Sequence, residues 1–489
     1  MNFLKIANEK LNQAFTQNGD YAYATSGSYC LDYFALIGGY RHHFNHILRS
    51  FMMAFNEDPK IALKTLFYAR DIRSGLGERN SFRLVLNALG NFYPEIAKKI
   101  LPYIPQYGRY DDVLVLLATP VKQDVLSMIQ NQLKEDVENK KNHQPYSLLA
   151  KWLPSINTSN QDAVSMANLI CKELKMTKKQ YRQTLSYLRK GLIVENHLRE
   201  KDYTFSYENL PGGALFKYQH AFMTNDSERY DAYLEKVSEG SAQMNTGTVF
   251  PYQIVRKIMN IESSLSEEEI QSLDTIWNSF HQHQIDSKCL VVRDGSGSMI
   301  SRCNPSPMDI ATSMAILMAE QLTGAFHNQF ITFSSRPKLV SIKGRDICEK
   351  IQYLMSFNDC TNTDIEKVYQ LILDVYQSEQ FSKEDALDQV IIISDMEFDC
   401  LRNPTKPNQS TFDYFKEEFK KINYPMPQLV FWNVNASHHL PVKQDEDGVY
   451  LISGASQNII KMIMNHEDLN PYQFMMKTLE KYSFIDEIL

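Results

Sequence analysis

The chain has 489 residues, of which 43% are hydrophobic and 22% are charged, and its formal net charge is −7. This balance is typical of globular proteins and argues against wholesale disorder, and the length predicts roughly two to four domains. Because no apolar run reaches the ~18 residues that span a bilayer, and the N-terminus lacks the apolar core of a signal peptide, we expect no membrane partner.

Residues 1–260 have the pattern of successive helices, and we expect the helical domain to comprise residues 1–285. Apolar residues recur at helical spacing, as at Ile61, Leu63 and Leu66, and glycines and prolines interrupt the pattern at short intervals. The segment from Thr177 to Gln180 predicts a capping box at the start of a further amphipathic helix. Helical hairpins with few strand signals predict an all-α, HEAT-like helical-repeat domain, although no fixed repeat period is present.

Basic residues of this helical part gather in two clusters. The candidates for contact with RNA are Arg70, Arg73, Arg79, Arg83, Lys178, Lys179, Arg182, Arg189 and Lys190. Cationic side chains interleaved with tyrosines can hold the backbone of a single strand and stack its bases. The alternative is that they are solvated or paired with Asp71, Glu78 or Asp111. An RNA site requires one connected surface, whereas the alternative predicts scattered or salt-bridged side chains.

The pattern changes toward residues 286–489, which we expect to form an α/β domain. Short β-branched runs alternate with helical patterns, which predicts a mostly parallel, doubly wound sheet covered on both faces. The expected strands are 289–293, 330–333, 339–342, 390–394, 429–434 and 449–452, and the second and third are expected to form an antiparallel hairpin at an edge. The expected helices are 308–323, 364–377, 411–421 and 455–465.

The acidic excess of the chain lies in this second part. Residues 1–285 carry 32 Lys and Arg against 30 Asp and Glu, a net charge of +2, whereas residues 286–489 carry 19 against 28, a net charge of −9. The whole molecule is therefore not expected to attract a polyanion from a distance, so any RNA binding has to depend on local basic clusters and should weaken steeply with salt.

Two expected strands end in oxygen-bearing side chains. The first runs into Asp294-Gly-Ser-Gly-Ser298, the strand at 390–394 runs into Asp395, and Thr361 and Thr363 lie in a loop between them. Open α/β sheets place their ligands at the carboxyl ends of the strands. Hydroxyls and carboxylates are hard donors that suit Mg²⁺ or Mn²⁺, so this edge is a candidate site for a divalent cation.

The pattern resembles the metal-ion-dependent adhesion site of von Willebrand factor A domains. The resemblance implies a cation held directly by Ser296, Ser298 and Thr363 and through waters by Asp294 and Asp395, with one position open to an anionic oxygen of a partner. The residues before Thr363 depart from the usual glycines of that family, which leaves Thr361 as an alternative ligand.

Catalytic interpretations find less support, and we expect no enzyme. The sequence around Ser296 is neither a nucleophile elbow nor a phosphate loop. His42, His43 and His46 share helical spacing without an evident acidic third ligand, and the pair at His438 and His439 is equally weak as a metal site. The seven cysteines are scattered and never spaced C-x-x-C, which indicates reduced thiols in a cytoplasmic protein and argues against a zinc site.

The arrangement of a helical-repeat part and an A domain resembles the Ro (TROVE-type) ribonucleoprotein family, and still more a related family of the same layout. The stretches that carry this resemblance are Arg70-Asp-Ile-Arg-Ser-Gly-Leu-Gly-Glu-Arg79, Gln106-Tyr-Gly-Arg-Tyr-Asp-Asp112, Leu149-Ala-Lys-Trp-Leu-Pro154, Tyr181-Arg-Gln-Thr-Leu-Ser-Tyr-Leu-Arg189, 294–299, Ser394-Asp-Met-Glu-Phe-Asp399 and Phe431-Trp-Asn-Val434. The resemblance implies a helical ring that binds small or single-stranded RNA and an A domain that closes it. The alternative is a metal-dependent adaptor that captures an acidic protein ligand.

Overall fold

The computed structural model describes residues 3–41, 43–260, 265–281, 284–301, 303–334, 336–358, 364–378, 381–399, 406, 409–435, 439–464 and 469–489. The chain divides into two compact units. The first, here called the sheet unit, comprises residues 1–68, 74–76 and 246–483. The second, the helical unit, comprises residues 69–73, 77–245 and 484–489. These units do not divide the chain at residue 285, since its first 68 residues belong with the sheet.

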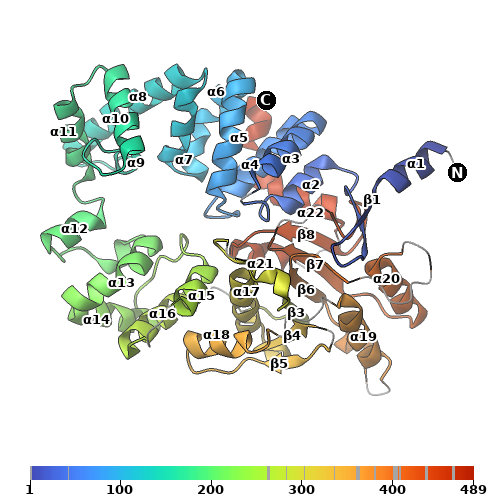
Figure 1. Cartoon of the computed structure of the whole chain (residues 1–489). Helices are drawn as coiled ribbons and strands as arrows, with labels where there is room; N and C mark the ends of the chain where they lie inside the picture. The colour runs from blue at the N-terminus through green and yellow to red at the C-terminus, as the bar shows by residue number, and fades with distance from the viewer. Residues whose placement is uncertain are drawn as a thin grey trace. The chain divides into compact units, whose positions relative to one another are not determined.

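A six-stranded sheet forms the centre of the sheet unit (Figure 1). Its strands, in spatial order, are β5 (Leu339–Ser341), β4 (Gln329–Phe333), β3 (Cys289–Asp294), β6 (Gln389–Ser394), β7 (Gln428–Asn433) and β8 (Val449–Ser453). All neighbours are parallel except β4 and β5, which form an antiparallel hairpin. This is the doubly wound order, in which the chain leaves the first strand, β3, and later returns to its other side as β6.

Helices bury the strands of the sheet. Every residue of β6 is buried, in line with the continuous apolar runs of parallel strands that are covered on both faces. Helix α17 (Pro307–Gln321) packs against β3, β4 and β6, and α22 (Pro471–Leu479) packs against β8. The remaining helices that follow residue 246 in this unit are α15 (Pro251–Met259), α16 (Glu267–Asn278), α18 (Ile347–Met355), α19 (Ile365–Tyr376), α20 (Thr411–Lys421) and α21 (Asn458–Ile463).

The N-terminal segment packs onto this sheet. It contains α1 (Phe3–Leu11), a hairpin of β1 (Gln13–Phe15) and β2 (Tyr21–Tyr23), and the helices α2 (Tyr29–Leu36), α3 (Phe44–Glu57) and α4 (Pro59–Arg70). Helix α2 contacts β8, and the Gly38 amide donates to Ser453 Oγ at 2.9 Å. The absence of a side chain at Gly38 permits this approach, because a Cβ there would stand 2.6 Å from the Ser453 backbone.

The helical unit is all-α. Its longer helices are α5 (Arg79–Phe92), α6 (Pro94–Ile100), α8 (Lys122–Lys141), α10 (Gln161–Glu173), α11 (Lys178–Arg189), α12 (Val194–Glu200), α13 (Gly212–Asn225) and α14 (Ser227–Ser238). Shorter elements include α7 (Ile104–Tyr107), the 3₁₀ segment η2 (Tyr110–Ala118) and α9 (Leu149–Trp152). Helices that follow one another in the chain pack together, such as α5 with α6 and α13 with α14. No helix within the described ranges is long and apolar enough to cross a bilayer.

Most of the elements expected from the sequence are present. Each of the six expected strands overlaps an observed one, the edge hairpin of β4 and β5 is confirmed, and the capping box of Thr177 and Gln180 starts α11 as predicted. The five cysteines in the described ranges are free thiols. The prediction of helices throughout residues 1–260 was wrong for β1 and β2, where Tyr21 and Tyr23 alternate with small residues and Gly19, at φ 91°, makes the turn.

A buried pair of opposite charges organises the core of the helical unit. Arg70 is 2% exposed and its Nε donates to Asp112 Oδ2 at 2.7 Å, while Asp112 is fully buried. The Arg83 Nε donates to the other carboxylate oxygen at 2.6 Å. Gly108 leaves the space for this pair, because a Cβ there would stand 2.5 Å from Asp112 Oδ2 and 2.9 Å from Arg70 Nε.

We expect Asp112→Asn to lower the unfolding free energy of the helical unit by about 3–5 kcal/mol, because it leaves the guanidinium of Arg70 buried without a counter-charge. The measurement is chemical denaturation followed by circular dichroism. Asp162→Asn, at an exposed position of α10, is the matched control and should change stability little. A stability of Asp112→Asn within about 0.5 kcal/mol of the wild type would contradict this role.

Candidate functional site

Two carboxylates lie at the carboxyl ends of adjacent strands, at the point where the strand order reverses. Asp294 is the last residue of β3 and Asp395 comes directly after β6, and these strands are paired in parallel. Both side chains are buried. The carboxyl ends of two parallel strands on either side of such a switch point form the usual ligand crevice of doubly wound sheets. The structure therefore brings together the two aspartates that the sequence selected.

The loop after β3 folds its serines over these carboxylates. Asp294 Oδ1 accepts from the Ser296 amide at 2.8 Å, and Asp294 Oδ2 accepts from Ser394 Oγ at 2.6 Å. The Ser296 and Ser298 hydroxyls lie 3.0 Å apart, and Ser298 hydrogen-bonds the Asp395 side chain. The two threonine candidates, Thr361 and Thr363, lie outside the described residues.

The charge balance of this crevice suits a cation. Burial, together with the negative charge of Asp395, raises the pKa of Asp294 to about 7, and burial also raises the pKa of Asp395. Two buried carboxylates that repel each other are stabilised by a positive ion between them. Their oxygens and the hydroxyls of Ser296 and Ser298 form a hard-donor set, which fits Mg²⁺ or Mn²⁺ and not the softer transition metals.

One further charge lies beneath the site. Arg293 is buried, and burial lowers its pKa to about 10, while the adjacent Asp294 favours its charged form. Its guanidinium donates to Thr312 Oγ1 at 3.0 Å and to Asn358 Oδ1 at 2.6 Å. These bonds hold the end of the α18 segment against β3, close to Gly295, where a Cβ would stand 3.3 Å from the Phe357 carbonyl oxygen. No pattern in the sequence predicted that this arginine would lie in the core.

The loop beyond Asp395 is held by the N-terminal hairpin. Met396 has a left-handed backbone, with φ 64°, which strains a non-glycine residue and turns the chain sharply after Asp395. Thr16 Oγ1 donates to the Phe398 carbonyl at 2.6 Å, and the Gln17 amide donates to Glu397 Oε2 at 2.6 Å. Residues about 380 positions apart therefore position this loop, which no local pattern of the sequence predicts.

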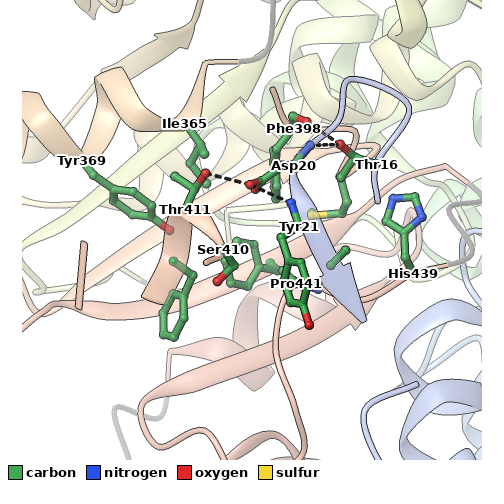
Figure 2. Close-up of a pocket in the computed structure, with 14 residues that line it drawn as sticks. Thr16, Asp20, Tyr21, Ile365, Tyr369, Phe398, Ser410, Thr411, His439 and Pro441 are labelled. Atoms are coloured by element: carbon green, nitrogen blue, oxygen red, sulfur yellow. Dashed lines mark hydrogen bonds between the residues drawn. The ribbon is translucent and has the colours of Figure 1, made fainter. Parts of the chain in front are cut away.

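A small cavity of about 10 Å³ separates the hairpin from helices α19 and α20, and it has room for about one water. Figure 2 shows Asp20 pointing from the hairpin toward Thr411 at the start of α20, and Tyr369 of α19 lies on the same side. Asp20 Oδ1 accepts from the Tyr21 amide at 2.9 Å and from Thr411 Oγ1 at 3.1 Å (Figure 2). Burial outweighs these bonds and raises the pKa of Asp20 to about 7.

The basic residues of the first cluster are mostly occupied by internal contacts. Arg70 and Arg83 share Asp112, and Arg83 also pairs with Asp111 at 2.7 Å. Arg73 is exposed, and its Nη1 donates to the Gln106 carbonyl at 2.9 Å. Arg79 is exposed and forms no ion pair within the described residues. Arg70 and Arg83 are therefore salt-bridged, as the alternative predicts, although the sequence did not predict Asp112 as the partner of Arg70.

The second cluster lines a groove of about 820 Å³ beside α11 and α12, here called the α11 groove. Four of the sequence candidates line it, and they are Lys179, Arg182, Arg189 and Lys190. Arg199 and His197 also line it, each beside an acidic residue: Arg199 pairs with Glu200 and His197 with Asp202, both at 3.2 Å. Lys178 is exposed but lies outside the groove lining.

The lining cations have two different roles. Lys179, Arg182 and Lys190 are exposed, and among the residues that the structure describes their side chains have no counter-ion. Arg189 is instead a structural residue. Its guanidinium donates to the Ala150 carbonyl at 2.8 Å, to the Leu153 carbonyl at 2.6 Å and to Ser155 Oγ at 2.6 Å, which fixes one wall of the groove.

The sequence did not predict the contacts that Arg109 makes. Arg109 lies 3.8 Å from the centroid of the Trp152 ring, and its guanidinium contacts Asp111. Both residues were part of motifs noted in the sequence, but nothing in their spacing brings them together.

The two histidine groups considered as weak metal sites stay untested, because His42 and His438 lie outside the described residues. Across the described ranges, no three or more His, Cys, Asp and Glu side chains cluster as metal ligands.

Comparison with known protein families assigns the chain to one of them. Residues 16–106 and 110–288 match the family described as a domain of unknown function (DUF2828), and these segments make up more than half of the chain. The chain belongs to this family. Residues 288–483 match a second family, also described as a domain of unknown function (DUF7788). The DUF2828 match thus includes residues of both compact units, because residues 16–68 belong to the sheet unit.

Individual proteins are also similar to this member of the DUF2828 family. An uncharacterised protein of Acanthamoeba polyphaga mimivirus is 28% identical over 523 aligned residues, which cover 96% of this chain and 88% of that protein. The crystal structure of the Ro (RSR) protein of Deinococcus radiodurans aligns with a TM-score of 0.47 and 16% identity, over 89% of this chain and 93% of that chain.

The buried carboxyl of Asp20 predicts that the stability of the folded protein depends on pH. Because burial raises the pKa of Asp20 from 3.8 to about 7, the folded state favours the protonated carboxyl. The resulting stability is present below about pH 4 and is lost as the pH rises toward 7 and above. We expect Asp20→Asn to remove this loss, which amounts to about 2–4 kcal/mol.

The measurement is the melting temperature of the wild type and of Asp20→Asn between pH 5 and pH 8. The wild type should lose stability relative to Asp20→Asn as the pH rises. Asp447→Asn, at an exposed position, serves as the control and should follow the wild-type profile. Parallel pH profiles for the wild type and Asp20→Asn would show that the buried carboxyl does not titrate in this range.

Proposed function

We propose that this protein is a non-enzymatic RNA-binding scaffold whose α11 groove holds single-stranded RNA. The observation that carries the proposal is the row of Lys179, Arg182 and Lys190, three exposed cations that line one groove without counter-ions in the described chain. Unpaired cations along a groove attract a chain of phosphates, and the release of counter-ions from the nucleic acid provides the free energy of binding.

The dimensions and the polarity of the groove support a flexible polyanion as its occupant. The volume of about 820 Å³ lies toward the upper end of the range for ligand sites, and Lys179, Arg182, Arg189 and Lys190 give the lining a cationic character. Arg189 fixes the wall, so the cations of α11 are presented by a rigid helix rather than by a loop.

The net charge of −7 does not oppose this assignment, because the acidic excess belongs to residues 286–489 and the groove to the helical unit. Binding at physiological salt then depends on the local field of a few cations, which is screened beyond about 8–10 Å. The proposal places the protein in the cytoplasm, where free thiols and RNA coexist.

We further propose that the sheet unit binds Mg²⁺ or Mn²⁺ as A domains do. Asp294, Ser296, Ser298 and Asp395 would hold the ion, and the resemblance to A domains adds Thr363, which lies outside the described residues. Bound there, the ion supplies a positive centre that neutralises the two carboxylates and accepts an anionic oxygen. In the scaffold its role is to stabilise the closure of the fold or the docking of a partner, with no catalytic step.

A second candidate function is a metal-dependent adaptor that takes an acidic side chain of a partner protein. The observation that favours it is the exposure of Ser298 and of the neighbouring Ile300, which is 60% exposed, at the open side of the crevice. A carboxylate can complete the coordination of a cation there while Ile300 adds apolar contact. In this alternative the cations of the α11 groove are a solvated surface.

For the RNA proposal, we expect the double variant Lys179→Glu/Arg182→Glu to weaken binding of a single-stranded RNA at least tenfold. Fluorescence anisotropy with a labelled oligonucleotide, between about 50 and 200 mM salt, measures it. The variant should also reduce the slope of log affinity against log salt by roughly 0.7 for each phosphate that the protein no longer neutralises.

The matched control for this experiment is Lys172→Glu/Lys178→Glu, which changes the net charge equally at exposed positions outside the groove. It should retain most of the affinity. An equal loss of affinity in both double variants would indicate a non-specific charge effect. Crosslinking of the purified protein from cells, followed by sequencing of attached RNA, then identifies the natural ligand, and an absence of RNA favours the adaptor.

For the metal proposal, Mg²⁺ should raise the melting temperature of the wild type, and a chelator should reverse the increase, because the ion binds only the folded state. Asp294→Asn keeps the shape of the side chain but removes its charge, and it should lose most of this response. Asp286→Asn, at an exposed position of the same unit, should respond like the wild type. Equal responses of all three proteins would refute a cation at this crevice.

A further inference from the structure

A second group of cations in the helical unit has more positive charge than its partners neutralise. Arg70 ends α4, Arg79 and Arg83 lie on the first two turns of α5, and Arg109 precedes η2. They surround two carboxylates at the start of η2. This group is here called the arginine cluster, and its members are Arg70, Arg79, Arg83, Arg109, Asp111 and Asp112.

The two carboxylates are fully engaged by three of the arginines. Asp112 accepts from Arg70 Nε at 2.7 Å, from Arg83 Nε at 2.6 Å and from the Arg109 amide at 2.9 Å. Asp111 accepts from Arg109 at 2.9 and 2.5 Å and lies 2.7 Å from Arg83 Nη2. Four guanidinium groups therefore share two negative charges, which leaves an excess charge of +2 within the cluster.

The excess charge is located at Arg79. This side chain is exposed, and it forms no ion pair in the part of the chain that the structure describes. Partial burial and then the positive charges of Arg109 and Arg83 lower its pKa, whereas Asp111 and Asp112 act in the opposite direction. Arg109 and Arg83 thus lie within electrostatic range of Arg79, and the excess positive charge of the cluster would stabilise an anion at this position.

The neighbouring groups fix the orientation of the free donors. Both the Nε and the Nη2 of Arg109 are directed at Asp111, which leaves its Nη1 group for another acceptor. The flat face of the same guanidinium lies 3.8 Å from the centroid of the Trp152 ring. An arginine held by a carboxylate on one edge and an indole on its face loses little conformational freedom when its remaining edge binds a ligand.

We propose that Arg79 and the free edge of Arg109 form a binding site for a phosphomonoester dianion, the terminal phosphate of an RNA strand. The excess charge of +2 matches the charge of a phosphomonoester near neutral pH, whereas a phosphodiester within a strand carries only one negative charge. Arginine donors are suited to phosphate because their paired N–H groups match its oxygens. The RNA identity of the ligand rests on the function proposed above; the phosphate site itself does not.

The test compares three oligonucleotides of one sequence, with a 5′-phosphate, a 3′-phosphate or hydroxyls at both ends. Anisotropy at fixed salt is measured for the wild type, Arg79→Gln and Arg182→Gln. We expect the wild type to bind one phosphorylated strand about tenfold more tightly than the hydroxyl strand. Arg79→Gln should lose this preference, whereas Arg182→Gln, in the α11 groove, should weaken all three strands equally and keep the preference.

Equal binding of the three strands by the wild type would overturn the terminal-phosphate site while leaving RNA binding in the groove intact. If no strand binds, the proposed function fails, and thermal shift with inorganic phosphate at constant ionic strength decides the site separately. Stabilisation of the wild type but not of Arg79→Gln supports a phosphate site, and a phosphoserine peptide then tests a protein source. If phosphate raises the melting temperature of the wild type and of Arg79→Gln equally, the proposed phosphate site is overturned.

Discussion

The parallel pairing of β3 with β6 places two buried carboxylates side by side, and much of the sheet unit follows from the need to balance them. Asp294 and Asp395 are buried and repel each other, and their oxygens are held by the Ser296 amide and the hydroxyls of Ser298 and Ser394. These neutral donors reduce the repulsion without removing it. The proposed Mg²⁺ or Mn²⁺ would complete the balance.

The helical unit has the opposite imbalance. Asp112 is fully buried and satisfies Arg70, which would otherwise be a buried charge without a partner, and the shared carboxylates leave positive charge at the surface near Arg79. The residues of the arginine cluster therefore stabilise the core and also produce a positive electrostatic field at the surface. The α11 groove follows a similar principle, because Arg189 is used in the wall and leaves Lys179, Arg182 and Lys190 exposed.

Long-range contacts connect the N-terminal segment to the crevice of Asp294 and Asp395. The hairpin of β1 and β2 hydrogen-bonds the loop that follows Asp395, in which Met396 has a left-handed backbone. Strain of this kind persists only where surrounding contacts determine the conformation. The N-terminal segment is thus a structural part of the sheet unit, and a fragment that begins near residue 286 would lack the contacts that shape one side of the crevice.

The sequence alone determined the local elements and the chemistry of the crevice. Apolar runs identified all six strands of the sheet, a capping box identified the start of α11, and strand-end aspartates identified the pair that the parallel sheet brings together. These predictions were correct because hydrophobic periodicity and capping depend on a few neighbouring residues. The meeting of the two aspartates follows from a general rule, that the carboxyl ends of parallel strands lie at one edge of the sheet.

Only the tertiary structure decided which charges are free. Arg70 and Arg79 lie in one motif and look alike in the sequence, yet the first is buried on Asp112 and the second is exposed, because the partner lies 42 residues away in the chain. The hairpin that holds Glu397 and the stacking of Arg109 on Trp152 are equally non-local. Pairing of distant charges depends on packing, which no local pattern of residues specifies.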